Sequence, residues 1–132
     1  MKSKKLDSGY KIENIILVES NFKRTENINF DKKDSNQEID VNVDVIVKDN
    51  KVIVTETVNY KHTFNKEDQI TSVIKMAGIF EKSGESKIDL EDFGYINGAA
   101  IIFPFIREHL SNLAIKAGVG IILLPPLNFT KK

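Results

Sequence analysis

The sequence predicts an α+β fold, in which a four-stranded antiparallel sheet is followed by one long helix. Four segments, at residues 10–22, 39–47, 52–64 and 69–80, alternate apolar and polar side chains as strands do. A later segment, at about residues 101–117, instead repeats its apolar side chains at helical spacing. Strands that come first in a chain, with a helix after them, are typical of an α+β domain with an antiparallel sheet.

Length and composition limit the classes of protein that remain. The 132 residues fit one domain over 1–132, in which we expect 1–9 to be disordered and 130–132 to form a tail. Nineteen basic residues balance nineteen acidic ones, which argues against nucleic acid as a partner. The chain has no cysteine, and no apolar run approaches the roughly 20 residues of a membrane span. We therefore expect a cytoplasmic protein without direct membrane insertion.

The predicted strands differ in how they divide their two faces. In residues 39–47 the valines point one way and Asp40, Asn42 and Asp44 the other, as in a strand with one buried face. In residues 10–22 we expect the even-numbered side chains, including Ile16, Val18 and Phe22, on one face, and Ile15 and Leu17 on the other. Both faces are thus partly apolar, which indicates a strand that is covered on one face and touched by a partner on the other. The polar stretch 23–38 is predicted to be a long crossing connection, with Ile28 and Phe30 as its apolar tether.

The second half of the chain predicts a capped helix and an extended tail. Asp89 is placed to cap a short helical turn at 90–95, and Gly118 to end the main helix. The tail over 120–129 is too apolar for a free end, and Pro125 and Pro126 exclude a helix there. We therefore expect the tail to be extended and packed against the rest of the protein.

No set of side chains predicts catalysis, so we expect no enzyme, no metal site and no cofactor. The two histidines, His62 and His109, lie in a strand and in the helix, and adjacent Glu108 and His109 point about 100° apart on a helix. A structural role for both histidines is favoured over a small-ligand or hot-dog-like enzyme that uses one of them. The apolar material nevertheless exceeds what one thin sheet and one helix can bury. An oligomer interface explains this excess, with or without an added groove for apolar segments of a client.

Three segments resemble the SecB family of protein-export chaperones. Ile102-Phe-Pro-Phe-Ile-Arg-Glu108 resembles the Leu-Phe-Pro-Tyr-Ala-Arg-Glu motif that opens the long helix of that family. Gly120-Ile-Ile-Leu-Leu-Pro-Pro-Leu-Asn-Phe129 resembles its Pro-x-Leu-x-Leu-x-Pro-Val-Asn-Phe ending, and Gly78-Ile-Phe80 matches the close of its fourth strand. The resemblance covers residues 10–129 in order.

This resemblance implies an ATP-independent holdase that binds unfolded or precursor polypeptides for protein export. It implies a homo-dimer or homo-tetramer, joined through sheets and through a helix layer of Ile102, Phe103, Ile106, Leu110 and Leu113. The side chains we expect to contact a client are Ile16, Val18, Phe22, Phe30, Phe80, Leu124 and Phe129.

Departures from the family pattern leave other functions open. Glu19 matches an acidic position that faces the translocase ATPase SecA, whereas Lys23 and Val73 stand where further acids are expected. The chain has no tryptophan, which the family usually carries in its crossover loop, and it stops at Lys132, so we expect a divergent member with a shortened C-terminus. SecA therefore remains a possible partner. A dedicated chaperone of a toxin–antitoxin system and an oligomeric scaffold without clients remain alternatives.

Overall fold

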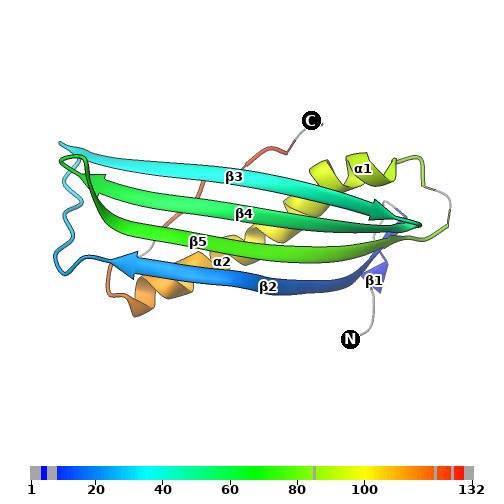
Figure 1. The fold of residues 1–132 in the computed structure, drawn as a ribbon, viewed down its shortest axis with the longest axis horizontal. Helices are drawn as coiled ribbons and strands as arrows, with labels where there is room; N and C mark the ends of the chain where they lie inside the picture. The colour runs from blue at the N-terminus through cyan, green and yellow to red at the C-terminus, as the bar shows by residue number, and fades with distance from the viewer. Residues whose placement is uncertain (1–3, 6–8, 85, 121, 126, 130–132) are drawn as a thin grey trace.

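A computed structural model describes residues 4–5, 9–84, 86–120, 122–125 and 127–129 of the chain. Its strands are β1 (Lys4–Lys5), β2 (Tyr10–Arg24), β3 (Ser35–Lys48), β4 (Lys51–Phe64) and β5 (Glu67–Lys82). They form one antiparallel sheet in the order β1-β2-β5-β4-β3 (Figure 1). The helical part consists of α1 (Leu90–Phe93), the five-residue π-helical segment η1 (Gly94–Gly98) and α2 (Ala99–Lys116). The predicted four long strands and one long helix are thus confirmed.

The start of the chain adds a short fifth strand to the prediction. The backbone of Lys4–Lys5 pairs with β2, opposite Ile12 and Lys11. We expected disorder over 1–9. Apart from this strand and Gly9, that range consists of residues 1–3 and 6–8, which lie outside the described part. The expected tail 130–132 also lies outside it.

The hairpins use the residues that their turns require. Asp49, in the two-residue turn between β3 and β4, has a φ of 57°, and Asn65 and Lys66 have φ values of 52° and 66°. In the second turn, Asn65 and Lys66 give two consecutive positive φ angles, which match the twist of a tight hairpin, and Asp and Asn tolerate a positive φ better than most residues. On β4, even-numbered side chains from Val52 to His62 are buried on the helix side of the sheet, and odd-numbered ones lie half-buried on the opposite face.

Two bulges in β2 explain why both of its faces are partly apolar. The pairing of β2 with β5 skips Glu13 and Val18, and each skipped residue reverses the face of the side chains after it. Ile12 therefore faces the helix opposite Phe80, Ile16 faces away opposite Ala77, and Ser20 and Phe22 face the helix again. A single unbroken alternation from Tyr10 to Phe22, which placed Ile16 and Val18 beside Phe22, was wrong.

The helix crosses one face of the sheet diagonally, from β3 and β4 at its start to β2 at its end (Figure 1). Asp89 caps α1 as predicted, because its side chain accepts a hydrogen bond from the Asp92 backbone N–H. Gly118, with a φ of 73°, follows the end of α2, also as predicted. Glycines allow the start of the helix to approach the sheet closely: a Cβ at Gly94 would lie 2.6 Å from Val45 Cγ1.

The predicted apolar helix stripe faces the chain's own sheet. Ile102, Phe103, Ile106 and Leu110 are buried in the core with Phe80 and Phe93, and Leu113 is partly buried against it. Our assignment of Ile102, Phe103, Ile106 and Leu110 to an oligomer interface was therefore wrong, and that of Leu113 stays a prediction. Periodicity identified the apolar face of the helix, but not the surface that covers it.

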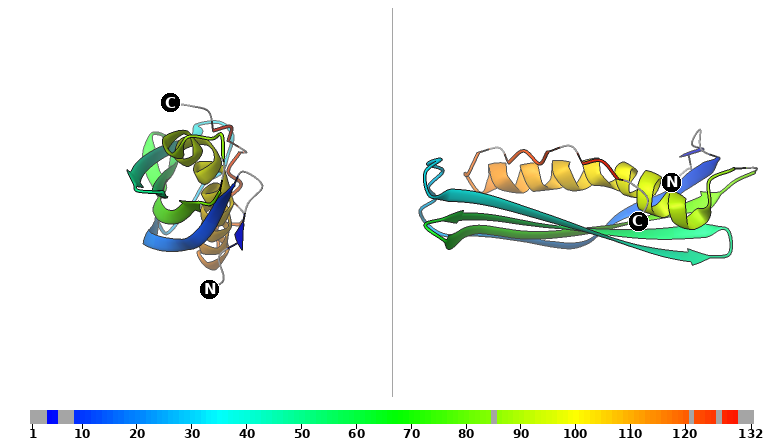
Figure 2. Two further views of the ribbon diagram at one scale, coloured as in Figure 1. Left: turned by 90° about the vertical axis from the view of Figure 1, so that its right-hand side faces the viewer. Right: turned by 90° about the horizontal axis from the view of Figure 1, so that it is seen from above.

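The tail returns along α2 on the helix side of the sheet (Figure 2). Ile122 and Leu124 are buried, the Ile122 carbonyl accepts a hydrogen bond from Ser111 Oγ, and Phe129 meets Phe103 edge-on. The described tail residues lie outside helices and strands, so the expected extended and packed tail is confirmed for them.

Candidate functional site

The predicted client-contacting side chains fall into four separate places, one of which is that of Phe129, partly buried against Phe103 of α2. Phe80 and Leu124 belong to the core, with at most 4% of either exposed, so they cannot meet a client in this structure. Ile16 faces away from the helix opposite Ala77, and its neighbour Val18 is bulged out of the pairing and exposed. Phe22 and Phe30 lie on the helix side, at the end of the sheet where β2 finishes. Sequence reasoning missed this division because it depends on the two bulges and on the packing of the tail.

The corner that contains Phe30 is built from the crossing segment and the end of the sheet. The Asn29 backbone N–H donates to Gln69 Oε1 at 2.7 Å, and the Asn29 carbonyl lies 2.8 Å from His62 Nε2. The Phe30 ring lies over His62, with centroids 4.6 Å apart and planes tilted by 39°. Phe30 remains 51% exposed, and His62 is buried beneath it.

Arg24 anchors the root of the crossing segment to the end of the helix. Its guanidinium donates to the carbonyls of Thr25, Glu26 and Ala117. Ala117 is the C-cap of α2, where unpaired carbonyls concentrate partial negative charge and favour a cation. The crossing segment is therefore held both at its root and at Asn29.

The face of α2 that points away from the sheet carries exposed apolar side chains. Phe105 is 48% exposed and Ile115 is 57% exposed. Leu123 and Leu127 of the neighbouring tail are also exposed. Large exposed apolar side chains at this density are typical of interaction surfaces.

The sheet face away from the helix is mixed in character. Glu19 lies opposite Lys75 on β5, and Lys23 and Val73 share that face with it. A concavity of about 520 Å³ crosses all four long strands here, with Asn21, Asp40 and Lys61 among its lining residues. The predicted SecA-facing residue is therefore exposed on a face where acidic and basic side chains alternate.

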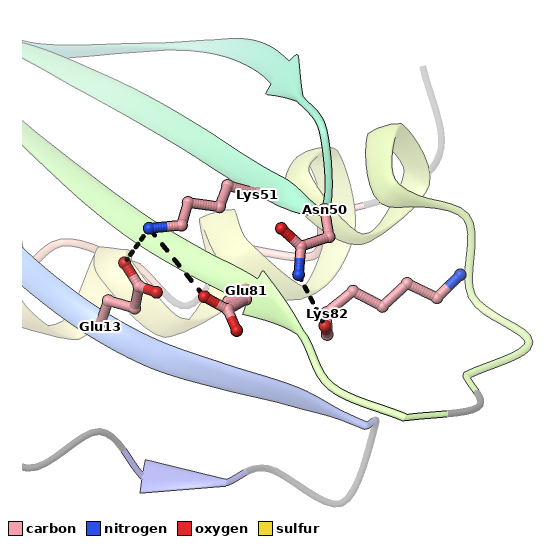
Figure 3. A network of polar contacts seen from close by, with 5 residues as sticks. All are labelled: Glu13, Asn50, Lys51, Glu81 and Lys82. Carbon is pink, nitrogen blue, oxygen red and sulfur yellow. Dashed lines mark hydrogen bonds and ion pairs between the residues drawn. The ribbon is translucent and has the colours of Figure 1, made fainter.

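A polar network links three strands at the opposite end of this sheet face, beside the bulge at Glu13 (Figure 3). Lys51 Nζ lies 3.1 Å from Glu13 Oε2 and 4.0 Å from Glu81 Oε2. A hydrogen bond shared between the two carboxyl groups lowers the pKa of Glu13, with help from Lys51, and raises the pKa of Glu81. These side chains join β2, β4 and β5 across the bulge.

The two histidines serve separate parts of the fold. His62 bonds to the crossing segment, and His109 Nε2 lies 2.8 Å from Ser20 Oγ, which links α2 to β2. Within the described residues, no group of three or more His, Asp or Glu side chains could hold a metal ion. No helix in that part of the chain has the length and apolarity needed to span a membrane.

Relatives of known sequence match most of the chain. The family model described as preprotein translocase subunit SecB matches residues 8–131. An uncharacterized protein of Methanocaldococcus jannaschii is 31% identical over 104 residues, or 74% of this chain and 66% of that protein. The protein-export protein SecB of Halorhodospira halophila is 32% identical over 78 residues, or 59% of this chain and 44% of that protein. Each match thus spans less than two thirds of the relative's length.

A solved structure shows the same fold. It is the SecB-like chaperone Rv1957 of Mycobacterium tuberculosis, in complex with a ChAD peptide from the HigA1 antitoxin. It superposes with a TM-score of 0.72 at 14% identity and covers 89% of this chain and 90% of its own. Because the family match extends from residue 8 to residue 131, this chain belongs to the SecB family.

Proposed function

We propose that this protein is an ATP-independent holdase, which binds unfolded or precursor polypeptides in protein export. The observation that carries the proposal is the exposed Phe30 ring over His62, on the helix side of a SecB fold. An exposed aromatic ring gains free energy when an apolar client side chain covers it, and this gain depends little on the client's sequence. The proposed activity is binding without a chemical step.

The sheet offers a second kind of contact to an extended client. β3 is the last strand of the sheet, and its fourteen residues pair only with β4 among the described strands. An edge strand leaves backbone N–H and C=O groups open to another extended segment. Several weak contacts of both kinds on one oligomer would add up to a useful affinity.

For the oligomer, we propose that the outward face of α2 meets another copy of the chain. Phe105 and Ile115 on the helix, with Leu123 and Leu127 on the tail, would lose their exposure in such a contact. A homo-dimer or homo-tetramer built this way would use the outward face of α2 as its interface. The sequence had instead suggested the opposite face of that helix.

A dedicated chaperone of a toxin–antitoxin system is the second candidate. The solved relative binds an antitoxin peptide, and the lysines around Glu19 leave its sheet face without a clear acidic patch for SecA. Binding of purified SecA at physiological salt separates the two candidates. The export function predicts a saturable complex that Glu19→Lys weakens, and the antitoxin function predicts none.

Suppression of aggregation tests the holdase proposal itself. Chemically denatured citrate synthase is diluted into buffer without nucleotide, and light scattering is followed with and without an equimolar amount of the protein. We expect scattering to fall strongly, and to fall less with Phe30→Ser. Unchanged scattering with the wild-type protein would reject the proposal.

A further inference from the structure

In the middle of the crossing segment between β2 and β3, Asn29 is hydrogen-bonded to two strands of the sheet. Gln69 of β5 accepts from its N–H at 2.7 Å. His62 of β4 meets its carbonyl at 2.8 Å, and because a carbonyl can only accept, Nε2 must carry the proton. Side chains from β4 and β5 therefore form hydrogen bonds with both backbone polar groups of Asn29.

The residues on either side of Asn29 extend this hold into a defined turn. Asn29 Oδ1 accepts from the Asp31 N–H at 2.8 Å, so the chain folds back around Phe30. Ser35 Oγ donates to the Asn29 carbonyl at 3.3 Å, where β3 begins. An exposed polar connection would otherwise sample many backbone conformations, and ordering it on binding would cost free energy.

With Asn29 fixed in this way, one side of the Phe30 ring packs against the protein and the other side is open to solvent. Its ring lies 4.6 Å from the buried ring of His62, yet half of its surface remains exposed. Phe22 faces the same side of the sheet, in the register row beside Ser72, and the neighbouring row contains Arg24, Ile70 and His62. An aromatic ring fixed on one side by another ring offers its free area to a third flat apolar group.

We propose that His62 and Gln69 are positioning residues, which hold Phe30 ready to stack on aromatic side chains of extended client segments. This inference rests on the proposed holdase function and names its preferred client chemistry. Neither His62 nor Gln69 needs to touch the client, because both act on Phe30 through the Asn29 backbone and His62 also supports its ring directly.

The first arm of the test measures client chemistry. Two fluorescein-labelled, unstructured 22-residue peptides are compared by fluorescence anisotropy; one carries four phenylalanines, and the other carries four leucines at the same positions. The wild-type protein is expected to prefer the phenylalanine peptide by about fivefold, as aromatic pairs allow. Phe30→Leu keeps an apolar side chain and should lose this preference.

The second arm tests whether the two positioning residues act through Phe30. His62→Leu and Gln69→Leu are each expected to weaken binding of the phenylalanine peptide by about three- to tenfold. In a Phe30→Leu background neither change should weaken it further. Gln69→Glu retains an acceptor oxygen and should retain affinity, and Asn59→Leu on the opposite sheet face is the matched control.

The outcomes that contradict the inference are distinct from failure of the holdase function. If wild-type protein suppresses aggregation but Phe30→Leu keeps the wild-type peptide preference, the inference alone is wrong. It is also wrong if His62→Leu and Gln69→Leu weaken binding equally with and without Phe30 and lower the melting temperature in parallel. A wild-type protein that neither suppresses aggregation nor binds either peptide contradicts both proposals.

Discussion

Glu56 is a fully buried carboxyl group on the helix side of β4. Its cross-strand neighbours are Val43 and Met76, and neither of its carboxyl oxygens has a hydrogen-bond partner among the described residues. Burial without a partner disfavours the charged form and raises the pKa of Glu56 to about 8. At neutral pH this side chain is therefore mostly an uncharged acid.

The raised pKa makes the stability of the fold depend on pH. Below pH 4.5 the carboxyl is protonated in both the folded and the unfolded chain, and its folded form carries no ionisation penalty. As the pH rises from 4.5 to about 8, the unfolded chain releases this proton while the folded chain keeps it, so stability falls. Above pH 8 both forms are ionised and the loss levels off.

Glu56→Met should remove this pH dependence. Relative to wild type, the free energy of unfolding of the variant should rise by about 1.4 kcal/mol per pH unit between pH 4.5 and 8. Urea denaturation over this range measures the difference, and Glu38→Met on exposed strand β3 is the control. Parallel curves for Glu56→Met and wild type would show that the carboxyl is paired or hydrated.

Single residues were the hardest features to predict from the sequence. Phe30 and Phe80 were both predicted to contact a client, yet one is half exposed and the other is buried under the helix. Both side chains are aromatic, but Phe80 lies in β5 against α2, whereas Phe30 lies in the crossing segment between β2 and β3. His62 and Gln69 form hydrogen bonds with the Asn29 backbone, although they lie 33 and 40 positions further along the chain. No local sequence pattern reveals such contacts.

At the scale of elements, the approach of the helix to the sheet depends on small residues. An added Cβ at Gly94 would meet Val45 and Val52 at 2.6–3.0 Å, and one at Gly98 would meet Val54 at 2.9 Å. These neighbours are short branched side chains in a packed core, so they have little room to move.

Gly94→Ala is therefore expected to destabilise the protein, although alanine normally favours a helix. Overpacking of this kind costs about 1–3 kcal/mol, more than the gain of about 1 kcal/mol from helix propensity. Thermal unfolding followed by circular dichroism measures the change, and Ala100→Ser at an exposed position of α2 is the control. An unchanged or higher melting temperature for Gly94→Ala would mean that the helix sits farther from the sheet.

Elements were predicted well where one simple period holds. The alternation in β3 and β4, the Asp89 cap and the Gly118 end all follow from local chemistry. β2 was mispredicted in detail because an inserted residue, such as Val18, has no signature of its own and still reverses every later side chain. The helix stripe was found, but an apolar stripe looks the same whether a sheet or another subunit covers it.

At the scale of the whole molecule, the two faces of α2 should respond differently to substitution. Phe105→Glu introduces a charge into the proposed interface, so light scattering should report a smaller particle with an unchanged fold. Ile102→Ala instead opens a cavity in the core, and it should cost about 2–5 kcal/mol of stability. A wild-type protein that already has the mass of one chain, 14.9 kDa, would contradict the proposed assembly.

The most direct measurement for the holdase account is binding of one polypeptide in its folded and unfolded forms. Fluorescein-labelled α-lactalbumin is titrated with the protein, native with its disulfides intact or reduced and carboxymethylated. The account predicts saturable binding of the unfolded form, insensitive to ATP and weakened by Phe30→Ser, with no binding of the native form. Equal binding of both forms, or binding of neither, would contradict it.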